Sequence, residues 1–126
     1  MANDFAAQLY HGDPLMVDHT PGSAVAAGEL VQLGELVCVA HNAIAANELG
    51  SLAYPGGNAV YKMKMNADAV FTAGARVYAD LTAQDVDYDA AVATDGMVGY
   101  AVAAADETAG DTHVYVVHDY DLDTDT

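Results

Sequence analysis

Short runs of apolar or alternating residues, each bounded by Gly, Pro, Asn or Asp, recur along the whole chain. These runs have the two-residue period of β-strands, and they are rich in Val, Leu and Tyr. We therefore expect about eight short strands, at residues 15–19, 29–33, 36–40, 49–53, 59–65, 76–80, 97–103 and 113–118. The predicted fold class is all-β, as a small β-barrel or β-sandwich. The Ala-rich stretches 42–49 and 101–109 allow at most one or two short helical turns.

Turn residues join these runs. Leu33-Gly34-Glu35-Leu36 predicts a tight hairpin, because Gly34 can adopt the positive φ that such turns need. A motif of small residues, with Gly or Asn at its third place, begins at residues 26, 45, 72 and 108, each time before a predicted strand. Gly and Asn tolerate the left-handed backbone conformation, so we expect the same turn chemistry at all four places.

The balance of charges excludes several kinds of partner. Three Lys and Arg residues stand against 19 Asp and Glu residues, and the formal net charge is −16. Nucleic acids and anionic membrane surfaces are not expected partners, because each phosphate contact requires a cation and only Lys62, Lys64 and Arg76 are available. No apolar run is long enough to span a bilayer, and we expect no export signal because the N-terminal residues lack a basic and an apolar region.

The excess of Asp and the scarcity of Lys suggest a halophilic surface, which is one adapted to high salt. At about 1 M salt the Debye length falls to roughly 3 Å, so surface carboxylates barely repel one another. At low salt the same charges destabilise the compact state. An ordinary acidic surface is the alternative. Salt adaptation predicts a melting temperature, measured by circular dichroism, that rises steeply with added NaCl or KCl, and a flat response contradicts it.

The residue types that usually carry catalysis form no motif in this sequence. The five His residues show no HxxxH spacing, and neither serine lies in GxSxG. No Gly-rich phosphate loop occurs. Cys38 lies in an apolar run and is expected to be a buried, inert thiol. We therefore predict no catalytic, cofactor-binding or metal-binding residues, and no enzymatic activity.

The two ends of the chain differ from the middle. Residues 1–14 carry scattered apolar side chains, which suits an arm that is loose alone and docks on a partner. The expected contact residues of this arm are Phe5, Leu9 and Tyr10. Residues 15–118 hold the predicted strands and form the expected domain. Residues 119–126 form an acidic C-terminal tail.

The order of the segments resembles that of a known protein family. The segments that carry the similarity are 20–31, 34–40, 44–52, 61–62, 71–80, 98–105 and 109–114. Within them, the turn-and-strand motifs include Ala26-Ala27-Gly28-Glu29-Leu30-Val31 and Thr72-Ala73-Gly74-Ala75-Arg76-Val77. Over residues 15–117 the chain resembles the capsid decoration (cement) proteins of tailed phages and other tailed viruses.

This resemblance implies a structural virion protein that binds the outer surface of a capsid and stabilises it. The implied partners are the major capsid protein and further copies of the chain, as a homotrimer. The implied location is the outer capsid surface, after synthesis in the host cytoplasm. Phe5, Leu9 and Tyr10 then become the expected capsid contacts, since an extended arm can add a strand to a sheet of the capsid protein.

Two other functions remain open on the sequence. A small β-module that binds a ligand or a carbohydrate is one, with eight Tyr but no Trp to stack on sugars. A biotinyl-like carrier domain is the other, because Met63-Lys64-Met65 resembles the biotin-acceptor tripeptide. In such domains the acceptor Lys lies at a hairpin tip, whereas the alternation of residues 59–65 predicts a continuous strand here.

Overall fold

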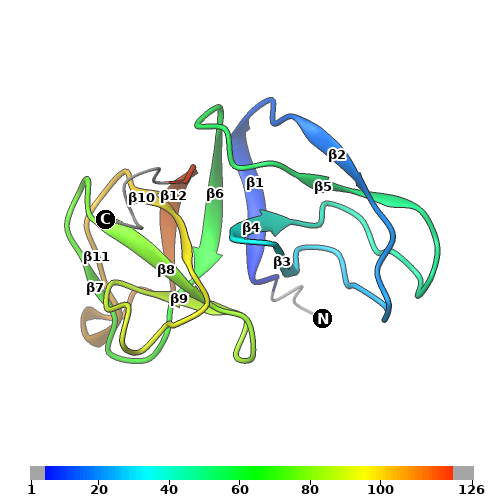
Figure 1. Ribbon diagram of the computed structural model, residues 1–126. Helices are drawn as coiled ribbons and strands as arrows, with labels where there is room; N and C mark the ends of the chain where they lie inside the picture. The colour runs from blue at the N-terminus through cyan, green and yellow to red at the C-terminus, as the bar shows by residue number, and fades with distance from the viewer. Residues whose placement is uncertain (1–4, 121–126) are drawn as a thin grey trace.

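The computed structural model describes residues 5–120 and shows a mainly β fold (Figure 1). The strands among these residues are β1 (Ala7–Gly12), β2 (Met16–His19), β3 (Leu30–Leu33), β4 (Leu36–Val39), β5 (Gly50–Ala53), β6 (Ala59–Lys64), β7 (Val70–Phe71), β8 (Arg76–Asp80), β9 (Asp85–Asp87), β10 (Met97–Ala101), β11 (Ala105–Asp106) and β12 (His113–His118). A six-stranded sheet has the order β1-β6-β12-β10-β8-β9, a four-stranded sheet has the order β2-β5-β4-β3, and β7 pairs with β11.

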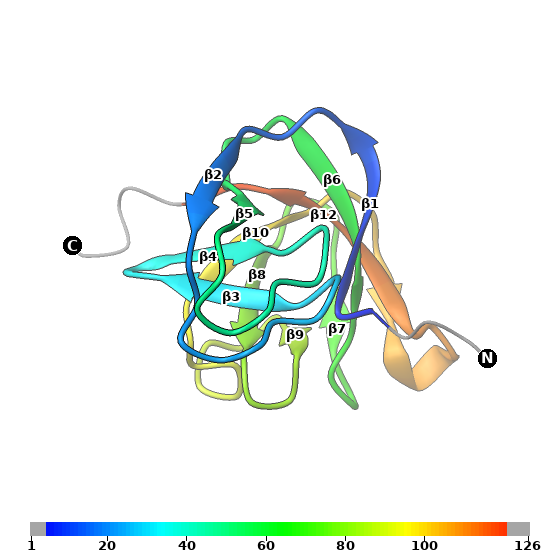
Figure 2. The ribbon, with the colours of Figure 1, turned by 90° about the vertical axis from the view of Figure 1, so that its right-hand side faces the viewer.

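The two larger sheets form a sandwich-like arrangement. In Figure 2 the strands β3 and β4 of the four-stranded sheet lie in front of the six-stranded sheet and cross the direction of β6 and β1. The six-stranded sheet curls until Met65, directly after β6, makes an isolated parallel bridge with Val86 of β9. The strands do not close into a barrel. The all-β prediction is confirmed. Of the two predicted forms, barrel and sandwich, the structure shows the sandwich-like one.

All eight predicted strands occur, several of them one or two residues shorter than expected. Among the described residues one 3-10 helix occurs, Glu107–Ala109, inside the Ala-rich stretch 101–109. The other Ala-rich stretch, 42–49, forms turns and one isolated bridge at Ile44. The unpredicted strands are β1, β7, β9 and β11. β7 and β11 have two residues each, too few to show a period, and β9 has the sequence Asp-Val-Asp, whose acids conceal the strand.

β1 departs from the expectation of a loose N-terminal arm. It pairs antiparallel with β6 of its own chain, from Ala7 opposite Met63 to Gly12 opposite Ala59. The register shifts between Leu9 and His11, which is a β-bulge, and this shift hides the strand's alternation in the sequence. The segment lies in the sheet because Ala7 is buried in the core at the sheet edge. The boundaries 1–14, 15–118 and 119–126 themselves stay a prediction, and residues 1–4 and 121–126 lie outside the described residues.

The core lies between the facing surfaces of the two sheets. Alternation along β6 buries Tyr61 and Met63, and alternation along β12 buries Val114 and Val116. Side chains of the four-stranded sheet pack in the same core, namely Leu30, Val37, Val39 and Ala53. Ala and Val make up most of this core, and such small side chains let the two sheets approach closely.

The four turns of the repeated motif adopt the expected conformation. Their third residues all have positive φ: Gly28 at 82°, Asn47 at 64°, Gly74 at 85° and Gly110 at 104°. In the first three turns the N–H of the fourth residue donates to the carbonyl of the first. A fifth turn of this kind, Asn66-Ala67-Asp68-Ala69, has Asp68 at φ 67° and was not predicted. Asp, like Asn, can hold this conformation through its short polar side chain.

Residues 24–33 and 43–52 have similar sequences and occupy matching places in the four-stranded sheet. Val25 and Ile44, at equivalent positions, exchange both backbone hydrogen bonds of an antiparallel bridge. Each copy leads from a turn into a strand, β3 in the first and β5 in the second. Two of the four strands, β3 and β5, are therefore copies of one turn-and-strand segment, and both flank β4.

Two histidines form polar links between the sheets. His118 of β12 is buried, its Nε2–H donates to the Val37 carbonyl oxygen at 2.7 Å, and its Nδ1 has no partner among the described residues. Burial lowers the pKa of His118 to about 4, so the ring is neutral at pH 7. The Nε2 of His41 lies 2.6 Å from the Tyr61 hydroxyl, and burial also lowers the pKa of His41. Both links therefore use neutral imidazole rings.

Candidate interaction surface

Neither a metal centre nor the setting of a carrier lysine is evident in the described part of the chain. Within residues 5–120 no group of three or more His, Cys, Asp and Glu side chains is placed to hold a metal ion. No helix in this range is long and apolar enough to cross a membrane. Burial raises the pKa of the Cys38 thiol to about 11, so the thiol stays protonated. Lys64 lies within β6, between β1 and β12, and not at a hairpin tip.

All three cations of the chain lie on the outer face of the six-stranded sheet. Lys62 and Lys64 alternate along β6 with buried residues, and they are half-exposed. Opposed residues of antiparallel strands point to the same side, and the register runs from Lys62 to Tyr115, and from Tyr100 to Arg76. We define the basic face as these cations and the tyrosines that share their side: Lys62, Lys64, Arg76, Tyr10, Tyr78, Tyr100 and Tyr115.

The two ends of the basic face differ in charge. At the β9 end, Asp80 and Asp85 lie opposite each other, and Asp85 is buried. Burial raises the pKa of Asp85, and the carboxylates of Asp80 and Asp87 raise it further, while the ammonium group of Lys64 lowers it. The cation Lys64 therefore faces carboxylates of its own chain. The opposite end, around Lys62, is the part of the face that lies away from this acidic group.

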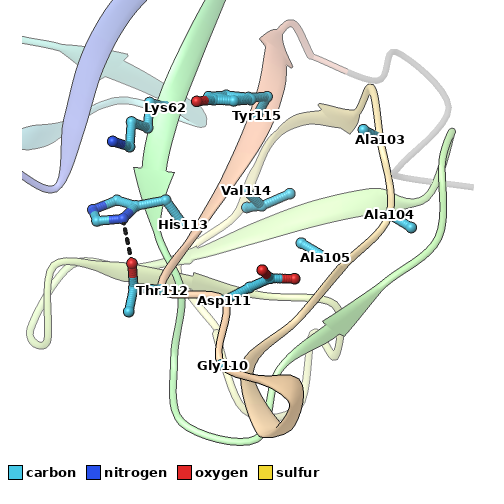
Figure 3. Close-up of a pocket in the computed structure, with 10 residues that line it drawn as sticks. All are labelled: Lys62, Ala103, Ala104, Ala105, Gly110, Asp111, Thr112, His113, Val114 and Tyr115. Carbon is cyan, nitrogen blue, oxygen red and sulfur yellow. Dashed lines mark hydrogen bonds between the residues drawn. The ribbon is translucent and has the colours of Figure 1, made fainter.

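A groove of about 410 Å³ opens beside Lys62 (Figure 3). Lys62, His113 and Tyr115 lie along one side of it, and residues 103–105 lie on the other. The Nδ1 of His113 is 2.8 Å from the Thr112 hydroxyl oxygen, and this hydrogen bond fixes the ring. The carboxylate of Asp111 also lines the groove, and one of its oxygens accepts the Asp106 N–H at 2.9 Å. We call this hollow the Lys62 groove.

The structure does not bring the three predicted contact residues together. Tyr10 lies at the bulge of β1, and its ring stacks on that of Tyr115 with centroids 4.5 Å apart, so it belongs to the basic face. Leu9 is paired with the buried Tyr61 and therefore points to the other side of the sheet. Phe5 and Leu9 line a second hollow, of about 190 Å³, beside Gly28 and His41. Tyr10 and the pair Phe5–Leu9 thus serve two different surfaces.

The groove residues Lys62, His113 and Tyr115 were not predicted as site residues. The sequence contained one signal for them, because the alternation in residues 59–65 places Lys62 and Lys64 on one side of a strand. The pairing of Lys62 with Tyr115 joins residues far apart in the chain, and no sequence pattern specifies that register. Acidic residues, unlike the cations, also occur in residues 15–54. This stretch contains Asp18, Glu29, Glu35 and Glu48 but no Lys or Arg.

Comparison with known families identifies the family of the chain. The model of a family described as phage cement protein matches residues 10–117. The chain belongs to the phage cement protein family. This confirms the resemblance seen in the sequence, and it makes the chain a phage structural protein. No curated protein and no solved structure matches it. In this cement protein the matched segment begins at Tyr10 in β1 and ends at Val117 in β12, so it includes the Lys62 groove but neither Phe5 nor Leu9.

Proposed function

We propose that this cement protein binds the outer surface of a tailed-virus capsid, contacts the major capsid protein and stabilises the shell without catalysis. The observation that carries the proposal is the family match over residues 10–117, which spans both sheets. The basic face supports it, because Tyr and Arg are typical of protein interfaces and this face collects them in an otherwise acidic chain. Many copies on one lattice add modest contacts into a strong total attachment.

The proposal includes a homotrimer on the capsid. Its support lies in residues 15–54, which we call the four-stranded sheet unit. This unit leaves large apolar side chains at the surface, with Leu15 at 61% and Leu49 at 70% exposure. A neighbouring copy can cover such side chains and gain the free energy of their burial. The sheets also end in largely exposed edge strands, β1 in one and β2 in the other, which offer backbone hydrogen-bonding groups to a neighbour.

Capsids of the parent virus that lack this chain test the proposed function. The purified protein should sediment with these capsids saturably, and it should raise the temperature at which they open and release their DNA. Complete capsids, whose sites are already occupied, serve as the control and should bind no more of it. Failure to sediment with the deficient capsids would exclude capsid binding, and an unchanged opening temperature would exclude stabilisation.

A further inference from the structure

Lys62 has an unusual environment for a cation in so acidic a chain. It lies in the middle of a sheet face, directly opposite Gln8 of β1 and Tyr115 of β12. Its side chain is half-buried. Within residues 5–120, no hydrogen bond or ion pair joins Lys62 to another side chain, although the chain has 19 carboxylates. An anion from outside the chain can therefore pair with this ammonium group without displacing a carboxylate of the chain itself.

The groups around Lys62 suit a protein partner. His113 is held by Thr112 on the same side of the groove, and its ring offers a further polar group (Figure 3). The stacked rings of Tyr10 and Tyr115 form an apolar flank with hydroxyl groups at its edge. Tyr is one of the residues enriched in interface hot spots, so this pair is a suitable anchor for a protein partner.

Charge determines which face a partner can approach. An acidic partner is repelled by the four-stranded sheet unit, which has carboxylates and no cations in residues 15–54. The β9 end of the basic face is acidic as well, because Asp80, Asp85 and Asp87 gather there. Lys62 lies on the part of the basic face away from these three carboxylates, and the Asp111 carboxylate in its groove already accepts the Asp106 N–H. Electrostatic complementarity of this kind fixes orientation more than it adds affinity.

We propose that the Lys62 groove receives an Asp or Glu side chain of the major capsid protein, so that the basic face turns toward the capsid and the four-stranded sheet unit turns away from it. This inference rests on the proposed function. The carboxylate accepts a charge-assisted hydrogen bond from the Lys62 ammonium group. The Tyr10–Tyr115 pair packs beside it and excludes water.

Substitution of Lys62 tests the groove on capsids that lack the chain. Lys62→Met keeps the length of the side chain but removes the charge, and it should weaken binding about 10- to 100-fold, the effect of one hydrogen bond to a charged group. Lys62→Arg keeps the charge and should bind within a few-fold of the original chain. Asn42→Asp, at an exposed position of the other unit, makes the same change in net charge as Lys62→Met and should leave binding unaltered. Thermal melting of each variant verifies that it is folded.

The outcomes separate the groove from the proposed function. If the original chain binds and Lys62→Met binds equally well, the proposed role of the Lys62 groove is overturned while capsid binding stands. If the original chain does not bind, both the proposed function and the proposed role of the Lys62 groove fail.

Zero-length carbodiimide cross-linking on decorated capsids identifies the occupant directly. The proposal predicts an amide between Lys62 Nζ and an Asp or Glu of the major capsid protein, located by mass spectrometry of the peptides. A cross-link from Lys62 to a second copy of this chain would place that copy in the groove and overturn the proposal.

Discussion

Replacing Gly99 with Ala should leave the protein largely unfolded, with a loss of about 4 kcal/mol or more in the free energy of unfolding. Gly99 lies in β10 between β8 and β12, where the register to β8 shifts after Met97. Its φ of 156° is rarely adopted by residues with a side chain. A Cβ there would lie 2.0 Å from the Val117 carbonyl oxygen and 2.8 Å from Val116 Cγ1. Neither the backbone of β12 nor the core can move away without breaking the sheet.

Gly74→Ala is the matched control for this substitution. Gly74 also has a positive φ, 85°, but no heavy atom lies within 4 Å of the place that a Cβ would take. The change should therefore cost only the backbone strain, about 1–2 kcal/mol. Urea unfolding followed by circular dichroism measures both variants. Equal losses for the two would show that the close contact with β12 does not hold in solution.

Acidification should weaken the fold through His118. Burial lowers the pKa of His118 from its ordinary 6.5 to about 4. Between these two values the unfolded chain binds a proton that the folded chain does not, so the free energy of unfolding falls as the pH falls through this window. The full shift corresponds to about 3 kcal/mol, and no further loss from His118 occurs below about pH 4. The pKa of His41 is lowered in the same direction, and its titration adds to the effect.

His118→Gln isolates this effect from the titration of the many carboxylates. The Gln amide can still donate a hydrogen bond to the Val37 carbonyl, but it does not titrate. The variant should be less stable at pH 7, yet its stability should change less between pH 6.5 and pH 4. Urea unfolding at a series of pH values gives the free energy of unfolding against pH for the original chain and for the variant. Subtracting one curve from the other removes the contribution of the carboxylates, which both chains share. Parallel curves would show that His118 is not the group responsible.

The sequence was sufficient for the larger strands and for the turns. Eight strands could be predicted because buried Val, Leu and Tyr alternate with polar residues between Gly and Asn turns. The positive φ of Asn47 followed from the chemistry of its side chain. β1 was assigned to an arm because the bulge at Tyr10 breaks its alternation, and β9 was missed because two of its three residues are Asp.

The candidate site was less accessible to sequence reasoning. The prediction of Phe5, Leu9 and Tyr10 as contacts assumed that residues 1–14 form one arm. Pairing of β1 with β6 instead places Leu9 and Tyr10 on opposite faces of a sheet. The Lys62 groove depends on β6, β12 and the segment 103–105, which meet only in the folded chain. Which side chains share a face follows from the strand register, and the register of distant strands is a property of the whole fold.

The composition of purified, mature virions tests the central claim most directly. If the chain is a cement protein on the capsid surface, quantitative mass spectrometry should find it in a constant, high ratio to the major capsid protein, and an antibody against it should label intact particles from outside. Its absence from mature particles, or its presence only in the infected cell, would contradict the account.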